Sequence, residues 1–173
     1  MMAVDEVGGC HPFRLVALLC VFVSLCLGAA AVFSPSWVTA DNFSQSLWDS
    51  CSQTQGDWLC DPDLQRDWQL ATLVLLLTGG SISLITFLVA VVLLCRGGPK
   101  RFYRIIAIML FISVVLQVCA LVLYPIKFID SIRLTVYHEF SWGYGIGWGS
   151  SIFALGGAVL YCLNTDAYEE DYY

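Results

Sequence analysis

The sequence predicts an all-α transmembrane four-helix bundle with a small extracellular antiparallel β-sheet. Three observations predict this fold: the composition, four long apolar segments, and β-prone segments in the loops between them. Of the 173 residues, 58% are hydrophobic and 13% are charged, whereas soluble domains contain about 45–50% apolar and about 25% charged residues. A soluble domain could not hide so much apolar surface, and the net charge of −6 argues against a nucleic-acid partner.

Four apolar segments are each long enough to cross a bilayer, which takes about 20 helical residues. Only Arg14, near the start of the first segment, places a charge within them. The spans leave no room for a separate soluble domain, so we expect one four-span domain over residues 1–173. The two loops at about 34–69 and 127–141 should lie on the side of the membrane opposite the termini. The expected spans cover about residues 13–33, 70–95, 105–126 and 142–163.

The first span has an alternative interpretation as a secretory signal peptide, because Ala29-Ala30-Ala31 resembles a signal-peptidase site. Two features favour a retained helix. The first ten residues contain Asp5 and Glu6 rather than basic residues, and the apolar run of about 20 residues exceeds the 7–15 of a signal core. An N-terminal sequence beginning at Val32 would contradict this expectation.

Basic residues predict the orientation of the bundle. Five of the eight lie at the N-terminal end of the first span and in the short connection between the second and third spans. Short loops rich in Lys and Arg face the cytoplasm, so we expect both termini in the cytoplasm and the two longer loops outside the cell. The five residues are Arg14, Arg96, Lys100, Arg101 and Arg104.

The first outer loop contains two features typical of an extracellular segment. Asn42-Phe43-Ser44 is an N-glycosylation sequon, a tripeptide that also arises by chance. Cys51 and Cys60 are the only cysteines expected on the outer side, and in an oxidising compartment such a pair most simply forms a disulfide. Two free thiols are the alternative.

The outer loops also contain the β-prone segments. Stretches around Trp48 and Trp58 flank a turn at Gln55-Gly56, which predicts a disulfide-linked hairpin. Residues 134–137 in the second loop read as another short strand, so one antiparallel sheet could draw on both loops. We expect Trp48 and Trp58 to form the core of the sheet, with a contact surface as the alternative. Trp37 and Trp68 lie near span ends and read as interfacial belt residues.

Acidic residues are concentrated in the first outer loop, which contains six aspartates and a single basic residue, Arg66. Such a group of acidic residues usually forms a solvated surface. The alternative is a functional surface that attracts cations. The aspartates are Asp41, Asp49, Asp57, Asp61, Asp63 and Asp67.

Small and polar residues within the spans indicate helix packing. Gly143, Gly145, Gly147 and Gly149 open the fourth span in overlapping G-x-x-x-G pairs, which let helix backbones approach closely. We expect packing within the bundle, with dimerisation as the alternative. Gln117 is the one strongly polar residue deep in a span, and such an amide usually bonds across to a neighbouring helix.

The remaining cysteines lie in the spans or on the expected cytoplasmic side. Cys95 and Cys162 are placed where the second and fourth spans leave the membrane, so they are candidate palmitoylation sites, with plain packing as the alternative. Cys20, Cys26 and Cys119 read as small core residues.

The chain offers no pattern for transport or catalysis. No Asp, Glu, Lys or Arg lies at mid-membrane, although pumps and ion-coupled transporters normally need such groups. His11 and His138 are expected on opposite sides of the membrane, and no metal, phosphate or cofactor motif is present. We therefore predict a non-enzymatic protein without a catalytic, cofactor or metal site.

The first outer loop also bears a family resemblance. Trp37, then Leu47-Trp48, then Cys51 and Cys60 follow the first span in the order and spacing of a family signature. With four spans, this pattern resembles the claudin and peripheral-myelin-protein superfamily. The resemblance implies a left-handed four-helix bundle with an outer antiparallel sheet. It also implies a plasma-membrane protein at cell–cell junctions, where relatives organise adherens and tight junctions and connect to cortical actin.

The sequence also departs from claudins. Ser46 stands where claudins have glycine before the Leu-Trp pair, and both outer loops are shorter than in claudins, which puts sealing strands and paracellular pores in doubt. The chain ends Asp171-Tyr172-Tyr173 rather than Tyr-Val. Such an end could still enter a PDZ groove by strand addition, or its tyrosines could be phosphorylated.

These observations lead to one functional hypothesis and two alternatives. The leading hypothesis is a protein that organises cell–cell junctions, in contact with membrane lipid, with junction proteins in cis or trans, and with a PDZ or cytoskeletal scaffold in the cytoplasm. An oligomer fits the same hypothesis. The alternatives are an auxiliary subunit of a channel or receptor, and a paracellular barrier or pore component.

Overall fold

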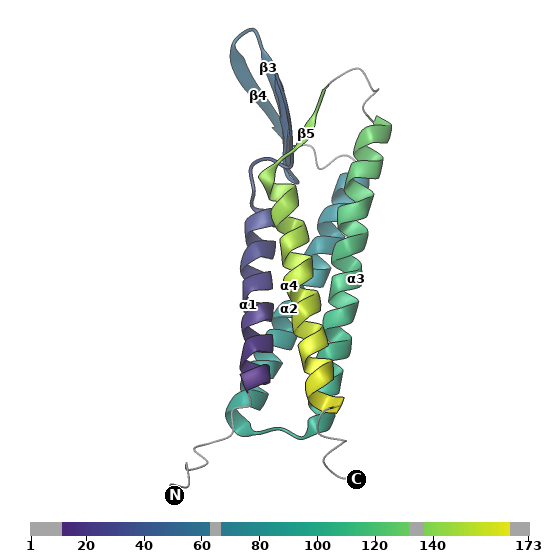
Figure 1. Cartoon of the computed structure of the whole chain (residues 1–173). Coiled ribbons are helices and arrows are strands. Elements are labelled where there is room, and N and C mark those ends of the chain that lie inside the picture. The colour runs from purple at the N-terminus through teal and green to yellow at the C-terminus, as the bar shows by residue number, and fades with distance from the viewer. Residues whose placement is uncertain (1–11, 63–66, 132–136, 167–173) are drawn as a thin grey trace, which may run out of the picture.

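The computed structural model describes residues 12–62, 67–131 and 137–166 of the chain. Within them, four long helices form a bundle, and a small antiparallel sheet covers one end of it (Figure 1). All four helices are long and apolar enough to cross a membrane, which confirms the predicted fold class. The helices are α1 (Pro12–Val32), α2 (Asp67–Arg96), α3 (Lys100–Ser131) and α4 (Trp142–Asp166).

Two of the helices, α2 and α3, extend further toward the sheet than the predicted spans. α2 begins at Asp67 and α3 continues through Pro125 to Ser131, so helical structure reaches into both segments predicted as outer loops, at about 34–69 and 127–141. Pro125 has no N–H with which to bond the carbonyl of Leu121 four residues earlier. The hydroxyl of Tyr144 donates to that carbonyl at 2.9 Å instead, so a residue of α4 satisfies the group that the proline leaves open.

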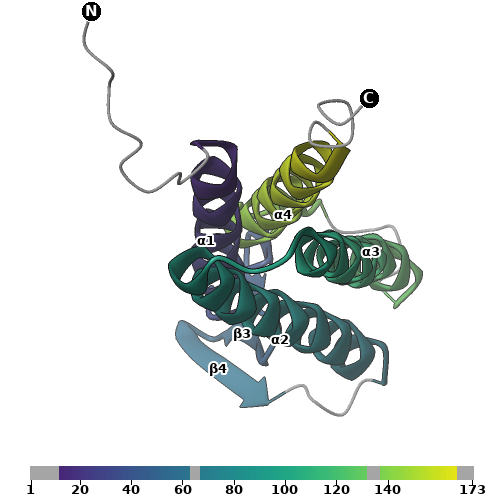
Figure 2. The same ribbon diagram turned by 90° about the horizontal axis from the view of Figure 1, so that it is seen from below.

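Figure 2 looks along the bundle from the end opposite the sheet. α1 packs along α4, α2 packs along α3, and α3 and α4 join the two pairs, whereas the seam between α1 and α2 is the least closely packed of the four. The first and last described residues, Pro12 and Asp166, both lie at the end opposite the sheet (Figure 1).

The sheet has the strand order β4-β3-β2-β1-β5 and every pairing in it is antiparallel. It draws on both loops, as predicted, since β5 comes from the second loop and pairs with β1. The predicted strand at residues 134–137 falls mostly outside the described residues, and Tyr137 is not in a strand. The strands are β1 (Val38–Ala40), β2 (Phe43–Gln45), β3 (Asp49–Thr54), β4 (Asp57–Pro62) and β5 (Glu139–Phe140).

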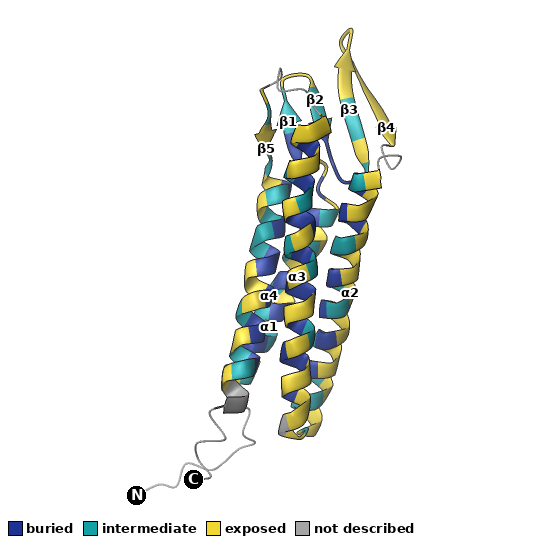
Figure 3. Ribbon diagram, turned by 90° about the vertical axis from the view of Figure 1, so that its right-hand side faces the viewer, coloured by how far each residue is buried: buried dark blue, intermediate teal, exposed yellow. Residues whose placement is uncertain are grey.

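Buried residues line the inside of the bundle, and exposed apolar residues cover its outside (Figure 3). This distribution is what a lipid-facing bundle requires, because helices packed in lipid stay apolar on both faces. The core has two clusters. The cluster near the sheet includes Trp37, Leu47, Leu121, Tyr124 and Phe128. The cluster at the other end includes Ala17, Val21, Tyr103, Leu110 and Tyr161.

A polar network joins the four helices between these two clusters. Gln117 of α3 receives a hydrogen bond from Ser151 of α4 at 3.3 Å, so the predicted bond to a neighbouring helix is present. Its amide nitrogen donates to Ser113 at 3.1 Å, which lies 2.6 Å from the hydroxyl of Ser83 in α2. Ser24 of α1 donates to the backbone carbonyl of Ser150 in α4 at 2.8 Å.

The four glycines at the start of α4 do not share one role. A Cβ on Gly143 would collide with the Ser34 side chain and lie 2.7 Å from the backbone oxygen of Ser36, and a Cβ on Gly147 would lie 2.9 Å from Leu121. Gly143 is therefore needed for close packing, whereas a Cβ on Gly147 would have to displace the end of the Leu121 side chain. The prediction was too broad for the others: a Cβ on Gly149 would make ordinary contact with a leucine at 3.6 Å, and one on Gly145 would meet nothing within 4 Å.

This difference predicts opposite effects for the same substitution. Gly143→Ala should lower the free energy of unfolding by about 1–3 kcal/mol, the usual cost of overpacking. Gly145→Ala should raise it by about 0.5–1 kcal/mol, because alanine favours a helix over glycine. Thermal unfolding of both purified variants in detergent measures the difference. Equal shifts of the same sign would contradict the close contact at Gly143.

Candidate functional site

The candidate site is the sheet together with its attachment to α1, where the family motif lies. Trp37 is fully buried, and its ring lies 4.9 Å from that of Tyr124 and 5.8 Å from that of Tyr144, centroid to centroid. Its indole N–H donates to the carbonyl of Ala31 at 2.8 Å. The last carbonyls of a helix have no partner within the helix, so Trp37 caps α1. The prediction of an interfacial belt residue is wrong for Trp37.

Trp48 forms the second half of this attachment. Its indole N–H donates to the carbonyl of Val32, the last residue of α1, at 2.8 Å. Leu47 beside it is fully buried in the cluster near the sheet. The motif therefore has a physical reason: two indoles bond successive carbonyls at the end of α1, and the leucine between the strands fills the core.

A pair of buried amides fastens the same loop to α2. Gln69 donates to the backbone carbonyls of Ser46 and Leu47 at 3.0 and 3.2 Å, and accepts a hydrogen bond from Gln45 at 3.1 Å. Both glutamines are fully buried. Sequence reasoning missed this pair, because Gln69 stands at the edge of an apolar run where polar residues are usually exposed. Trp68, next to it, is partly buried and lies 5.7 Å from the ring of Tyr124.

The hairpin of β3 and β4 is built as predicted, with the disulfide between Cys51 and Cys60. The two cysteines face each other directly across the strands. Gln55 and Gly56 form the turn, and both have positive φ angles, 55° and 98°. A two-residue turn of this kind needs positive φ at both positions, which explains the glycine.

The outer strand of the hairpin is exposed, contrary to the prediction that its tryptophan lies in the sheet core. All six residues of β4 are exposed, with Trp58 at 53% and Leu59 at 62% of their full accessibility. β4 is the edge strand, and Figure 1 shows the hairpin rising away from the bundle. Because no element among the described residues covers it, Trp58 belongs to a surface, whereas Trp48 belongs to the attachment.

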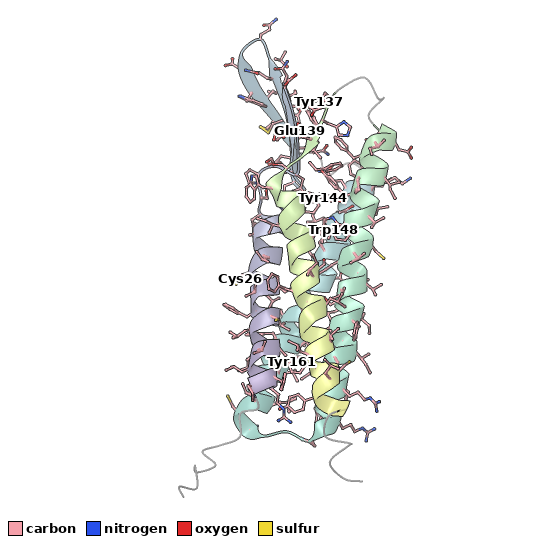
Figure 4. The ribbon with its side chains drawn as sticks, viewed as in Figure 1. Cys26, Tyr137, Glu139, Tyr144, Trp148 and Tyr161 are labelled. Atoms are coloured by element: carbon pink, nitrogen blue, oxygen red, sulfur yellow. A yellow bond between two sulfur atoms is a disulfide. The ribbon has the colours of Figure 1, made fainter. Side chains whose placement is uncertain are left out.

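Three further side chains, those of Asn42, Tyr137 and Glu139, lie on the surface at the sheet end of the molecule. Asn42 is exposed in the turn between β1 and β2, so its predicted glycosylation is sterically open. Tyr137 donates a hydrogen bond to the carboxylate of Glu139 at 2.7 Å, and both are labelled in Figure 4. This bond, together with the negative charge of Glu139, raises the pKa of Tyr137 above its ordinary value, because the phenolate form would lose the bond and be repelled.

The end of the bundle opposite the sheet holds Arg14, Arg96, Arg101 and Arg104, whereas Lys127 lies near the sheet end of α3. The guanidinium of Arg14 lies 4.3 Å from the ring centroid of Tyr103, which stacks on Tyr161 at 6.2 Å. The palmitoylation candidates lie at this end: Cys95 is exposed and Cys162 is partly exposed.

Three other cysteines were expected in the core. Cys20 is partly exposed, and Cys26 and Cys119 are exposed on the outside of the bundle (Figure 4 labels Cys26). The core prediction is therefore wrong for Cys26 and Cys119. Composition could not place them, because in a membrane the outward face of a helix is as apolar as the inward face. The candidate C-terminal motif at Asp171, Tyr172 and Tyr173 lies outside the described residues and stays a prediction.

Comparison with known proteins agrees with this fold and motif. The model of the PMP-22/EMP/MP20/Claudin family matches residues 13–161, which is most of the chain. A protein of Danio rerio named "p53 apoptosis effector related to PMP-22" is 32% identical over 117 residues, which make up 68% of this chain and 63% of the relative. The match thus spans less than two thirds of that relative's length.

The family match runs from Phe13 in α1 to Tyr161 in α4, and it includes the whole sheet, the attachment tryptophans and the disulfide. Together these findings show that the chain belongs to the PMP-22/EMP/MP20/Claudin family of membrane proteins.

Proposed function

We propose that this chain is a non-enzymatic plasma-membrane protein that organises cell–cell junctions, with its sheet outside the cell and both termini in the cytoplasm. Membership of a family that includes the claudins supports the proposal. The orientation is supported by the basic residues Arg14, Arg96, Arg101 and Arg104, which belong to helix ends opposite the sheet, since such residues stay in the cytoplasm.

The observation that carries the proposal is the exposed hairpin on a firmly attached sheet. Trp37 and Trp48 hold the sheet to α1, and the disulfide braces the hairpin. Exposed tryptophan is enriched in the energetic centres of protein interfaces, and a rigid surface loses little conformational entropy on binding. Trp58 and Leu59 therefore suit contact with a protein on the same or a neighbouring cell.

This contact surface predicts the outcome of a matched pair of substitutions. In confluent epithelial cells, Trp58→Ala should reduce enrichment of the tagged chain at cell contacts severalfold without changing its amount at the cell surface. Trp142→Ala should leave the enrichment unchanged, because Trp142 is equally exposed, at 55%, but lies on α4 at the edge of the membrane span. Unchanged enrichment of Trp58→Ala would contradict a contact through the hairpin.

The same cells separate this proposal from its alternatives. A pore component would change the ion selectivity of the cell layer, and substitution of Asp57 and Asp61 by asparagine would alter that selectivity. An auxiliary subunit would give a diffuse membrane signal and co-purify with a channel or receptor. The junction proposal predicts enrichment at contacts with unchanged selectivity.

A second candidate function comes from the relative whose name describes a p53 apoptosis effector. If this chain acted in that way, induced expression would raise the fraction of dying cells. The junction proposal predicts unchanged viability under the same induction, and annexin V staining measures the difference.

A further inference from the structure

A groove opens between α1 and α2 in the half of the bundle nearer the sheet. Its volume is about 400 Å³. The lining follows α1 from Ser24 to Val32, with Phe33 just beyond it, and α2 from Leu76 to Leu84, and Trp48 lies at its sheet end. The groove also reaches Gln117 of α3, so it passes between α1 and α2 toward the centre of the bundle.

Small residues hold the groove open. Gly28 of α1 and Gly80 of α2 both line it, and a Cβ on Gly28 would lie 3.0 Å from the Ser150 hydroxyl oxygen, so Gly28 also serves the packing of α1 on α4. A Cβ on Gly79 would lie 3.2 Å from the backbone oxygen of Ser113, so Gly79 serves the packing of α2 on α3. A Cβ on Gly80 would meet nothing within 4 Å. A glycine inside a helix costs about 0.5–1 kcal/mol relative to alanine, and no contact among the described residues accounts for that cost at Gly80.

The floor of the groove is polar, but its groups are already paired. The hydroxyl of Ser83 lies 2.6 Å from that of Ser113, and Ser24 and Ser150 each donate to the other's backbone carbonyl at 2.8 Å. Burying a polar group is costly only when it lacks a hydrogen bond. An apolar ligand can therefore cover this floor without breaking any bond.

Size and charge restrict what can occupy the groove. A helix is about 10–12 Å across with its side chains, so it could not enter between α1 and α2 without separating them. The volume lies within the range of about 300–1,000 Å³ for small-molecule sites. None of the lining residues carries a charge, so the groove offers no cation to a phosphate headgroup.

We propose that this groove binds one membrane sterol, which enters sideways from the leaflet nearer the sheet. The flat ring system lies against the wall formed by Gly28 and Gly80, and the hydroxyl lies toward Trp48 at the sheet end. A rigid ligand loses less conformational entropy on binding than a flexible acyl chain. The hydroxyl is the single polar group of a sterol, and because it is uncharged it needs no ionic partner in the groove.

The test uses the full chain in phosphatidylcholine nanodiscs that contain a photoactivatable cholesterol analogue. We expect labelling of residues 24–33 or 76–84 that saturates and that unlabelled cholesterol suppresses. Gly80→Leu fills the groove and should weaken the apparent affinity about tenfold, which corresponds to about 1.4 kcal/mol. Gly156→Leu is the matched control, because a Cβ there also meets nothing within 4 Å and Gly156 does not line the groove.

Three results would overturn the proposal. They are labelling that does not saturate, labelling that Gly80→Leu leaves unchanged, and equally saturable labelling of the same residues by a phosphatidylcholine with a photoactivatable acyl chain. Thermal unfolding of both variants shows that they are folded before the comparison is made.

Discussion

Replacing Trp37 by alanine is expected to lower the free energy of unfolding by about 3–5 kcal/mol, the usual cost of removing a large buried aromatic side chain. The substitution empties the space against Tyr124 and Tyr144 and leaves the carbonyl of Ala31 without its indole partner. Denaturant unfolding of the purified chain in detergent measures the loss. In cells, the variant should be retained before it reaches the surface.

Trp58→Ala is the control for this experiment, because it removes the same side chain from an exposed position. Its effect on stability should stay within about 0.5 kcal/mol. Similar losses for both tryptophans would contradict the distinction between an attachment residue and a surface residue.

The second large effect is expected from removal of the disulfide. Replacing Cys51 and Cys60 together by alanine should lower the free energy of unfolding by about 2–3 kcal/mol, on the loop-entropy model for a closed loop of this length. The bond links adjacent strands of the hairpin, so the loss should appear as local opening of β3 and β4. Hydrogen exchange of the strand amides, measured with and without the disulfide, locates the change.

A matched pair of cysteines controls for the loss of sulfur. Cys26 and Cys119 are exposed on the outside of the helices, so replacing both by alanine should change stability by less than about 0.5 kcal/mol. If removing the Cys51–Cys60 disulfide raised hydrogen exchange in the helices as much as in the hairpin, the disulfide would have a wider role than the contacts of the two cysteines indicate.

The bundle and the hairpin could be predicted from the sequence because each depends on local pattern. A helical span needs about 20 apolar residues in a row, and four such runs are visible. The turn at Gln55-Gly56 stands between two β-prone stretches with a cysteine in each. No knowledge of distant contacts is needed for either feature.

The attachment of the sheet could not be predicted, because it depends on contacts between distant residues. The bond from Trp48 to Val32 needs the chain to return to the end of α1, and nothing near Trp48 in the sequence indicates this. The same holds for Tyr144, which replaces the missing donor of Pro125. The family motif was the available signal in the sequence. It marked Trp37 and Trp48 as important, but it did not show that they attach the sheet to α1.

Which residues of the spans are buried could not be predicted from the sequence either. Gly143 and Gly145 belong to the same glycine pattern, yet one touches the loop after α1 and the other faces open space. Cys119 has the same apolar neighbours as a core residue but lies on the outside. Lipid makes both faces of a helix apolar, so periodicity does not separate them.

The distribution of a tagged full chain in confluent epithelium tests the proposed junction role most directly. The measurement is the ratio of signal at cell–cell contacts to signal on contact-free membrane, compared with the ratio for a lipid-anchored marker in the same cells. Junction organisation through the hairpin predicts a ratio severalfold above that of the marker, which Trp58→Ala lowers toward it. A ratio equal to that of the marker for the unsubstituted chain would contradict the proposal.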